Sequence, residues 1–309
     1  MLFRNLILFR LPDSWTISAL DLEEALAQRP LRPCGSFDLR TRGWVACGDS
    51  GRLAYPQGPH YLIALGIEQK ILPASVILHE ARQRAAVQAE AQGHPVGRRQ
   101  MRDIKARVTD ELRARALSRR RVTHAWINLR RGWLAVDASS EGRAEELVEV
   151  LGETLDGLAV TPLDTRRAPV DAMAAWLALG DAPGRLAIDQ ELELKAVDGA
   201  GAMVRYTRHP LDGADIRAHL AAGKQPTRLG LTWNDRIAVV LHRNLHLRRV
   251  QFLDVYKDDN AQGENPQEQF DIDFALMTGE LTQLVAEVLD ALGGLSAGEV
   301  AGVPMAAVA

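Results

Sequence analysis

The sequence predicts an α+β protein with two α/β modules, each built on antiparallel sheets, and a projecting helical hairpin. Strand-like segments alternate with helical patterns through both halves of the chain. A similar order of elements begins again at Pro162, although no internal repeat of matching residues is present. Residues 74–116 form two consecutive helical patterns with few apolar positions, which indicates a hairpin that projects from the body.

Length and composition set the outer limits. A chain of 309 residues predicts two domains, and its 47% apolar content is ample for their cores. The apolar start, 1–11, is broken by Arg4 and Arg10, which suits a strand better than a signal peptide, and no window approaches the roughly 18 apolar residues of a membrane span. Cys34 and Cys47 supply neither a disulfide framework nor a convincing zinc site. We therefore expect a reduced, cytoplasmic protein without metal or cofactor.

The first module is expected to span residues 1–73 and 122–160, with 74–121 inserted as a basic helical finger. Ser18 is predicted to cap a helix at 18–28, and the segment 48–58, rich in Gly and Pro, is predicted to be a loop. The module is completed by strands at 2–11, 36–46, 60–68, 122–129 and 133–138 and by a helix at 141–155.

The finger is expected to consist of helices at 74–92 and 99–116, joined by a turn containing glycine and proline. In its second helix the apolar residues recur at i, i+3 and i+4 and form one narrow stripe: Met101, Ile104, Val108 and Leu112. Such a helix would be about 27 Å long, enough to lie along several phosphates of a duplex.

Positive charge is concentrated on the same finger. From Arg98 to Arg121, ten of 24 residues are basic and three are acidic, a local charge of +7 in a chain of net charge −3. The cations that lie outside the apolar stripe include Arg98, Arg99, Arg102, Lys105 and Arg113. A one-signed surplus inside an acidic body points to a polyanionic partner; a solvated surface helix is the other interpretation.

The second module is expected to span 161–294 and to end in a long amphipathic helix. That helix has Asn265 as its cap, Pro266 at its first position and Glu268 in a box-like pair. Its apolar face comprises Phe270, Phe274, Met277, Leu281, Leu284, Val288 and Leu292. The other elements are helices at 169–179 and 212–222 and strands at 185–197, 202–209, 227–233, 236–243 and 246–254, with hairpin turns at Asn234-Asp235 and Arg243-Asn244. Residues 295–309 are predicted to be a disordered tail.

Catalytic signatures are weak. A metal-dependent nuclease would depend on Asp271, Asp273 and Glu280, but the two aspartates lie 200° apart around a helix, and acidic residues in a first turn complement the helix dipole. His242 and His246 could meet across a hairpin, without an evident third ligand. Neither a phosphate-binding glycine loop nor a nucleophile elbow occurs. The tryptophans do not interleave with the basic run, which argues against a stacking platform for single strands.

Several separate segments, in order, resemble the recombination-associated protein RdgC family over residues 1 to about 294. They are Met1 to Leu11, Pro33-Cys34-Gly35, Gly43-Trp44-Val45, Lys70-Ile71-Leu72-Pro73, Arg115-Ala116-Leu117-Ser118-Arg119, and Phe270-Asp271-Ile272-Asp273-Phe274 continuing into Leu276-Met277-Thr278-Gly279-Glu280-Leu281. The resemblance implies a homodimer closed into a ring at two contacts, with duplex DNA in a positively lined hole, little sequence preference, restraint of RecA-promoted strand exchange, and no catalysis.

The resemblance also carries residues over. Basic residues of the family correspond to Arg98, Lys105, Arg115 and Arg119, and a second basic stretch corresponds to Arg205 and Arg208, with fewer cations than is usual. At the finger contact this chain has Leu117, after Ala114-Arg115-Ala116, where the family has an aromatic residue after Pro-Arg-Ala.

The basic finger and the resemblance together predict a ring-shaped homodimer that binds double-stranded DNA without sequence preference and is associated with the nucleoid. Neither a membrane nor a small-molecule substrate is expected as a partner. The predicted DNA contacts are Arg98, Arg99, Arg102, Lys105, Arg113, Arg115, Arg119, Arg120, Arg205 and Arg208, with Leu117 as the finger contact. Two alternatives remain: a metal-dependent DNA-processing enzyme that uses Asp271 and Asp273, and a module whose arginines bind an acidic protein.

Overall fold

The computed structural model describes residues 2–13, 15–197, 201–253 and 263–296 of the chain. These residues form a mixed α+β fold, as predicted. Its helices are α1 (Ala19–Ala27), α2 (Ala74–Gln92), α3 (Arg98–Arg115), α4 (Glu141–Thr154), α5 (Pro169–Leu179), α6 (Ala214–Ala221) and α7 (Pro266–Ala291), with a short 3-10 helix, η1 (Gly48–Ser50).

The strands pair into a 12-stranded sheet in the order β2-β4-β5-β6-β1-β12-β11-β10-β8-β9, with β3 on β4 and β7 on β1. The first sheet half comprises β1 (Asn5–Arg10), β2 (Arg40–Val45), β3 (Ala54–Gln57), β4 (His60–Lys70), β5 (Ser118–Asn128), β6 (Trp133–Val136) and β7 (Thr161–Pro162). The second sheet half comprises β8 (Leu186–Lys195), β9 (Met203–Thr207), β10 (Gln225–Trp233), β11 (Ile237–His242) and β12 (Leu247–Phe252). Antiparallel pairing of β1 with β12, at Asn5↔Arg248, joins the halves.

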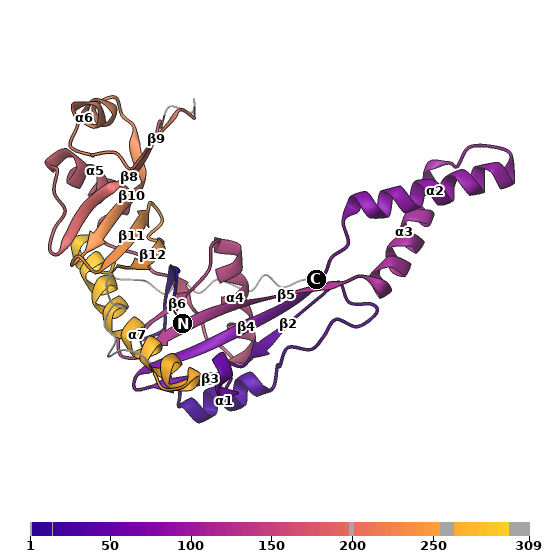
Figure 1. The fold of residues 1–309 in the computed structure, drawn as a ribbon, viewed down its shortest axis with the longest axis horizontal. Coiled ribbons are helices and arrows are strands. Elements are labelled where there is room, and N and C mark those ends of the chain that lie inside the picture. Colours follow the sequence, from indigo (N-terminus) through magenta and orange to yellow (C-terminus); the bar gives the residue numbers. More distant parts are fainter. Residues whose placement is uncertain (1, 14, 198–200, 254–262, 297–309) are drawn as a thin grey trace.

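The molecule is an open crescent (Figure 1). The second sheet half forms one arm, the first sheet half forms the floor, and the α2–α3 hairpin rises as the other arm (Figure 1). α4 lies on the inner side of the floor, whereas α7 runs along the outer side from one sheet half to the other (Figure 1). The prediction of a projecting hairpin is therefore confirmed.

One hydrophobic core spans both sheet halves, because α7 packs on the same outer face of each. Phe274, Met277 and Leu281 of α7 are buried with Trp126 of β5 and Trp233 of β10 in a single cluster. The predicted start of α7 is correct: the Asn265 side chain accepts the Glu268 N–H at 2.9 Å, and Pro266 follows. The predicted capping box is half formed. The Asn265 side chain accepts the Glu268 N–H, but the Glu268 carboxylate accepts the N–H of Glu264 in place of that of Asn265.

A second core occupies the face of the first sheet half that lies opposite α7. There α1 and α4 cover alternate residues of the strands, so that Leu26 and Leu147 are buried with Ile63 and Ala125. The predicted cap of α1 is confirmed, because the Ser18 side chain accepts the Asp21 N–H at 3.1 Å. The alternation between the two cores fixes which side chains of β4 and β5 lie on each face of the sheet.

The hairpin has only a small core of its own. Ala81 and Ala85 of α2 pack on Ile104 and Val108 of α3, with Met101 and Leu112 half-buried at the ends of the predicted stripe. The predicted helix at 99–116 is thus confirmed within one residue. Four buried residues are few for two helices with 37 residues in all. The position of the hairpin therefore depends on the contacts that attach its base to the floor.

Three predictions about local structure need correction. Residues 48–58 are not all loop, because β3 pairs with β4 at Ala54↔Ile63 through Gln57↔His60. The strand expected from 122 begins at Ser118, since Arg119–Arg121 pair with the extended end of β4. The tail is not free from 295: Leu295 forms a bridge with Thr165, and the rest of the predicted tail, 297–309, lies outside the described residues.

Candidate nucleic-acid interface

The α3 helix presents unpaired positive charge. It carries seven basic and three acidic residues, and two of the acids are already paired: Asp110 with Arg113 at 2.6 Å, and Glu111 with Arg84 of α2 at 2.7 Å. Within the described part of the chain, the exposed side chains without an ion pair include Arg98, Arg99, Arg102, Lys105, Arg107 and Arg115. Unpaired guanidinium and ammonium groups along one helix are suited to binding successive phosphates.

Arg113 is held differently from the other predicted contacts. Its side chain is largely buried, pairs with Asp110, and donates to the carbonyl of Phe37 at 3.3 Å. Lys70 of β4 in turn donates from Nζ to the Arg113 carbonyl at 2.7 Å. These contacts fasten the hairpin to the floor, so the structure gives Arg113 an anchoring position at the hairpin base.

Leu117 lies between α3 and β5, where its side chain is 80% exposed. Its carbonyl accepts the N–H of Ile71 at 2.7 Å, which ties together the two chain segments that connect the hairpin to the floor. Ile71 and Phe37 beside this connection are also exposed, at 51% and 87%. The predicted finger contact is therefore part of a small exposed apolar patch, defined here as Phe37, Ile71 and Leu117, whose members the sequence did not group.

Arg119 and Arg120 lie on β5 and point to opposite sides of the sheet, as neighbours on a strand do. Arg119 shares the inner face with Arg121, which pairs with Glu146 of α4 at 2.6 Å. Arg119, Arg121 and Arg143 of α4 line one cavity with Lys70. In the sequence Arg121 belongs to the basic run, whereas Lys70 and Arg143 lie outside it and join Arg121 only in the folded protein, where α4 crosses the sheet.

Arg205 lies on the face of the second sheet half away from α7. It donates to Glu193 of β8, whose side chain is 6% exposed and also accepts from Thr227 at 2.7 Å and pairs with Arg228 at 3.4 Å. Burial alone would raise the pKa of Glu193, but the bonds from Arg205 and Thr227 and the charge of Arg228 outweigh it, so the pKa is lowered. The ionised Glu193 thus holds two guanidinium groups on this face and neutralises one.

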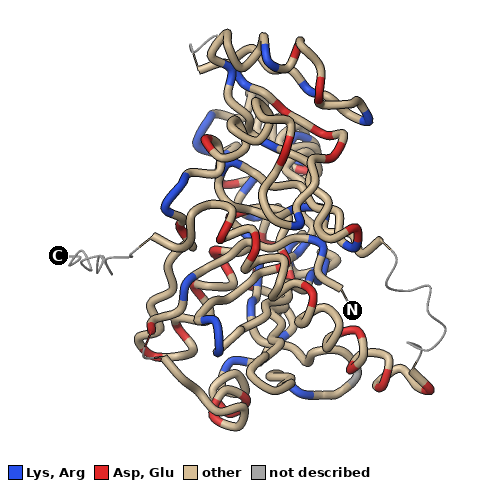
Figure 2. Tube along the Cα trace, turned by 90° about the vertical axis from the view of Figure 1, so that its left-hand side faces the viewer, with Lys and Arg blue, Asp and Glu red and all other residues tan. Residues whose placement is uncertain are grey.

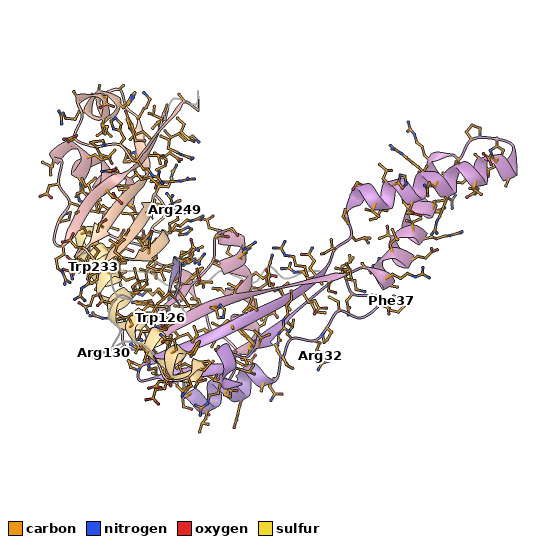
Figure 3. All side chains as sticks on the ribbon, viewed as in Figure 1. Arg32, Phe37, Trp126, Arg130, Trp233 and Arg249 are labelled. Atoms are coloured by element: carbon orange, nitrogen blue, oxygen red, sulfur yellow. The ribbon has the colours of Figure 1, made fainter. Side chains whose placement is uncertain are left out.

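Arg208 follows β9 in a left-handed conformation, with φ of 54°, and is exposed. The same face of the second sheet half carries Arg249, which pairs with Glu191 and lies toward the open side of the crescent (Figure 3). Trp233, in contrast, lies toward α7 (Figure 3). Arg228 and Arg249 were missed from the sequence, although basic residues at outward positions of successive strands could have indicated them.

The carboxylates considered for a metal enzyme have separate partners. Asp271 accepts from Tyr55 and from Gln267 at 2.8 Å, and the Tyr55 pKa is raised to about 12, first by burial and then by this carboxylate. Asp273 accepts from Gln269 at 2.7 Å, and Glu280 pairs with Arg236 at 2.7 Å. In the described ranges no group of three potential ligands is close enough to hold a metal ion.

His242 and His246, considered above as a possible pair across a hairpin, are joined by a hydrogen bond between their backbones. The His242 N–H donates to the His246 carbonyl at 2.9 Å, while the His246 ring lies 3.6 Å from Glu141. Burial lowers the pKa of His242 to about 4. Cys34 and Cys47 are both free thiols.

Figure 2 views the molecule from the side of the second sheet half, and in it basic and acidic residues of the described chain are interspersed along the trace. In the part of the chain that the structure describes, no helix has the length and apolar character needed to cross a membrane.

The fold and this surface define an α+β protein with a basic helical hairpin projecting from a continuous curved sheet. A family model described as "Putative exonuclease, RdgC" matches residues 1–295. The recombination-associated protein RdgC of Dechloromonas aromatica is 45% identical over 298 residues, which cover 95% of this chain and 98% of that protein. The proteins of the same name from Janthinobacterium sp. (strain Marseille) and Cupriavidus pinatubonensis are 42% and 43% identical over 295 and 296 residues, covering 95% of this chain and 98% and 99% of theirs. The chain belongs to the RdgC family, as the sequence motifs predicted.

Proposed function

We propose that this protein binds double-stranded DNA without sequence preference, as a ring-shaped homodimer that encircles the duplex and restrains RecA-promoted recombination. The observation that carries the proposal is the set of unpaired cations on α3, which rises from one end of a crescent whose opposite arm presents Arg205, Arg228 and Arg249 (Figures 1 and 3). Contacts to phosphates give affinity without sequence choice.

The crescent suggests how a ring would form. A single chain is open on one side, and a second copy facing it would enclose a channel bordered by the α2–α3 hairpin and the second sheet half (Figure 1). Closed cyclic symmetry is the usual arrangement of such homodimers. The exposed patch of Phe37, Ile71 and Leu117 offers apolar area for one of the two contacts, and Leu117 can pack there although it lacks an aromatic ring.

An encircling protein on the nucleoid would restrain recombination by occupying duplex that RecA-bound strands must invade. This function agrees with the name of the relatives, recombination-associated protein. It needs neither catalysis nor a cofactor. The predicted contacts Arg98, Arg99, Arg102, Lys105, Arg115, Arg119, Arg120, Arg205 and Arg208 are proposed to bind phosphates, and Arg113 to orient the hairpin.

The test is a salt titration of binding to two linear duplexes of unrelated sequence, measured by fluorescence anisotropy. If about 6–10 phosphates are neutralised, affinity should fall by roughly three to five decades between 50 and 200 mM salt. Equal affinity for both duplexes is also expected. A shallow salt dependence, or strong preference for one sequence, would contradict the proposal.

A nuclease is the competing function, because the matching family model carries the word exonuclease. It would require carboxylates to share a metal ion, whereas Asp271 and Asp273 each accept from a different glutamine. Incubation of labelled linear duplex with the protein and Mg²⁺ or Mn²⁺ decides between a nuclease and a DNA-binding protein without catalysis. Loss of cleavage in Asp271→Asn, with cleavage by the unaltered protein, would establish the nuclease. An acidic protein partner for the arginines would instead be indicated if duplex DNA failed to bind.

A further inference from the structure

A cavity of about 440 Å³ lies at the base of the hairpin, outside the helix α3 itself. One wall is apolar and comes from the end of β4 and the connection to α2: Ile67, Ile71, Leu72 and Pro73. The other wall carries Arg119, Arg121 and Arg143; Lys70 also lines the cavity, but its ammonium donates to the Arg113 carbonyl. Ile67 and Arg121 belong to the face of the sheet that α4 covers, so the cavity lies on that face, opposite α7.

Positive charge in this cavity exceeds its internal compensation. Of the three arginines, Arg121 alone is in an ion pair among the described residues, with Glu146 of α4, and the same carboxylate also pairs with Arg40. The Glu146 side chain is 10% exposed and is therefore occupied by two guanidinium groups. Arg119 has no ion pair in the described ranges, and Arg143 donates to the neutral hydroxyl of Ser139 at 3.3 Å.

The arginines in this cavity are close enough to disfavour one another. The pKa of Arg121 is lowered, first by burial and then by the charges of Arg40, Arg143 and Arg119. Its Nε is buried without a hydrogen-bond acceptor among the described residues. Repulsion of this kind destabilises the empty cavity and is relieved when an anion enters.

We propose that this cavity binds a phosphate group, with Arg119 and Arg143 as its principal ligands. A tetrahedral oxyanion matches the planar donor fork of arginine, and the apolar wall of Ile71, Leu72 and Pro73 strengthens the attraction by excluding water. The inference rests on the proposed binding of duplex DNA: the group is a backbone phosphodiester, held where the hairpin meets the floor. A phosphoryl group of a free ligand has the same chemistry, and the test separates the two.

The test compares two double variants of the full-length protein. Arg119→Gln with Arg143→Gln removes the two arginines of the cavity that are in no ion pair among the described residues. Arg130→Gln with Arg131→Gln removes two exposed arginines from the turn between β5 and β6, and Arg130 lies on the outer side of the crescent (Figure 3). Circular dichroism and the unfolding temperature without ligand establish that both variants are folded.

Two readouts are measured for each protein: the salt dependence of duplex binding, and the rise in unfolding temperature on addition of pyrophosphate at constant ionic strength. For the cavity variant we expect a salt slope smaller by about 1, affinity reduced roughly tenfold or more, and loss of the pyrophosphate effect. The control should match the unaltered protein in both readouts.

Failure of the phosphate site and failure of the proposed function give different results. If the unaltered protein binds duplex but the cavity variant matches the control in both readouts, the phosphate site is refuted and the proposed function stands. If pyrophosphate stabilises through the cavity but duplex does not bind, the site serves a free phosphoryl ligand, and both the phosphodiester assignment and the proposed function are refuted.

Discussion

Removal of charge from α3 should reduce the salt dependence of DNA binding by a calculable amount. The perturbation is fourfold: Arg98→Gln, Arg99→Gln, Arg102→Gln and Lys105→Gln, all at exposed positions without an ion pair in the described part of the chain. Glutamine is a good helix former, and the buried stripe of Ile104 and Val108 is untouched, so the hairpin should remain folded.

If each of the four cations neutralises one phosphate, the slope of log affinity against log salt falls by about 3.6. The unaltered protein should therefore lose about a hundredfold more affinity than the variant between 50 and 200 mM salt. Anisotropy titrations on a fluorescent duplex at several salt concentrations measure this difference directly.

A matched control removes four exposed arginines elsewhere: Arg32, Arg52, Arg130 and Arg131. Arg32 and Arg130 lie on the outer side of the crescent (Figure 3). The control should retain the original slope. An unchanged slope in the α3 variant, or an equal loss of slope in both variants, would refute the placement of duplex DNA against α3.

Three further predictions concern the scaffold. Val108→Ala, at a fully buried position between α2 and α3, should destabilise the hairpin by about 2 kcal/mol and increase amide hydrogen exchange in 74–115, with little change in the sheet. Gly43→Ala should cost several kcal/mol in chemical denaturation, because its Cβ would lie 2.5 Å from the backbone of Pro30 and Leu31; an unchanged midpoint would contradict this contact. Burial lowers the pKa of His124 to about 4, so the unfolded chain takes up this proton at a higher pH than the folded protein does. The free energy of unfolding should therefore fall by up to about 3 kcal/mol as pH falls from about 6.5 to 4, and His124→Gln should show a weaker dependence.

Much of the local structure could be predicted, because it depends on neighbours in sequence. Ser18 and Asn265 cap the helices that follow them, as their hydroxyl and amide chemistry requires. The 3.6-residue repeat from Met101 to Leu112 identified the buried side of α3. Asn234 and Asp235 both have positive φ, as a two-residue hairpin turn demands.

The errors arose where distant segments determine the local structure. β3 contains Tyr55 and Pro56 after a glycine-rich segment and is a strand only because β4 pairs with it. Arg119 to Arg121 look like the end of a charged run, but the unusually long β4 extends β5 through them. Propensity cannot detect such pairing when the partner is supplied by the fold.

The candidate site was only partly predictable, because several of its contacts join segments that are distant in the sequence. Contiguous cations on α3 are visible in sequence, but Glu193, which holds Arg205 and Arg228, is separated from Arg228 by 35 positions and joins it only across β8 and β10. The cavity at the hairpin base likewise combines β4, β5 and α4. The anchoring of Arg113 to Phe37 also depends on a contact between distant segments.

Encirclement of the duplex is tested most directly by blocking both ends of a linear DNA after the protein has loaded. The proposed ring predicts that a challenge with high salt releases the protein from open-ended DNA but leaves it on DNA whose two ends carry bulky blocks. Equal rates of release from blocked and open DNA would contradict a closed ring and would leave an open clamp that binds one side of the duplex.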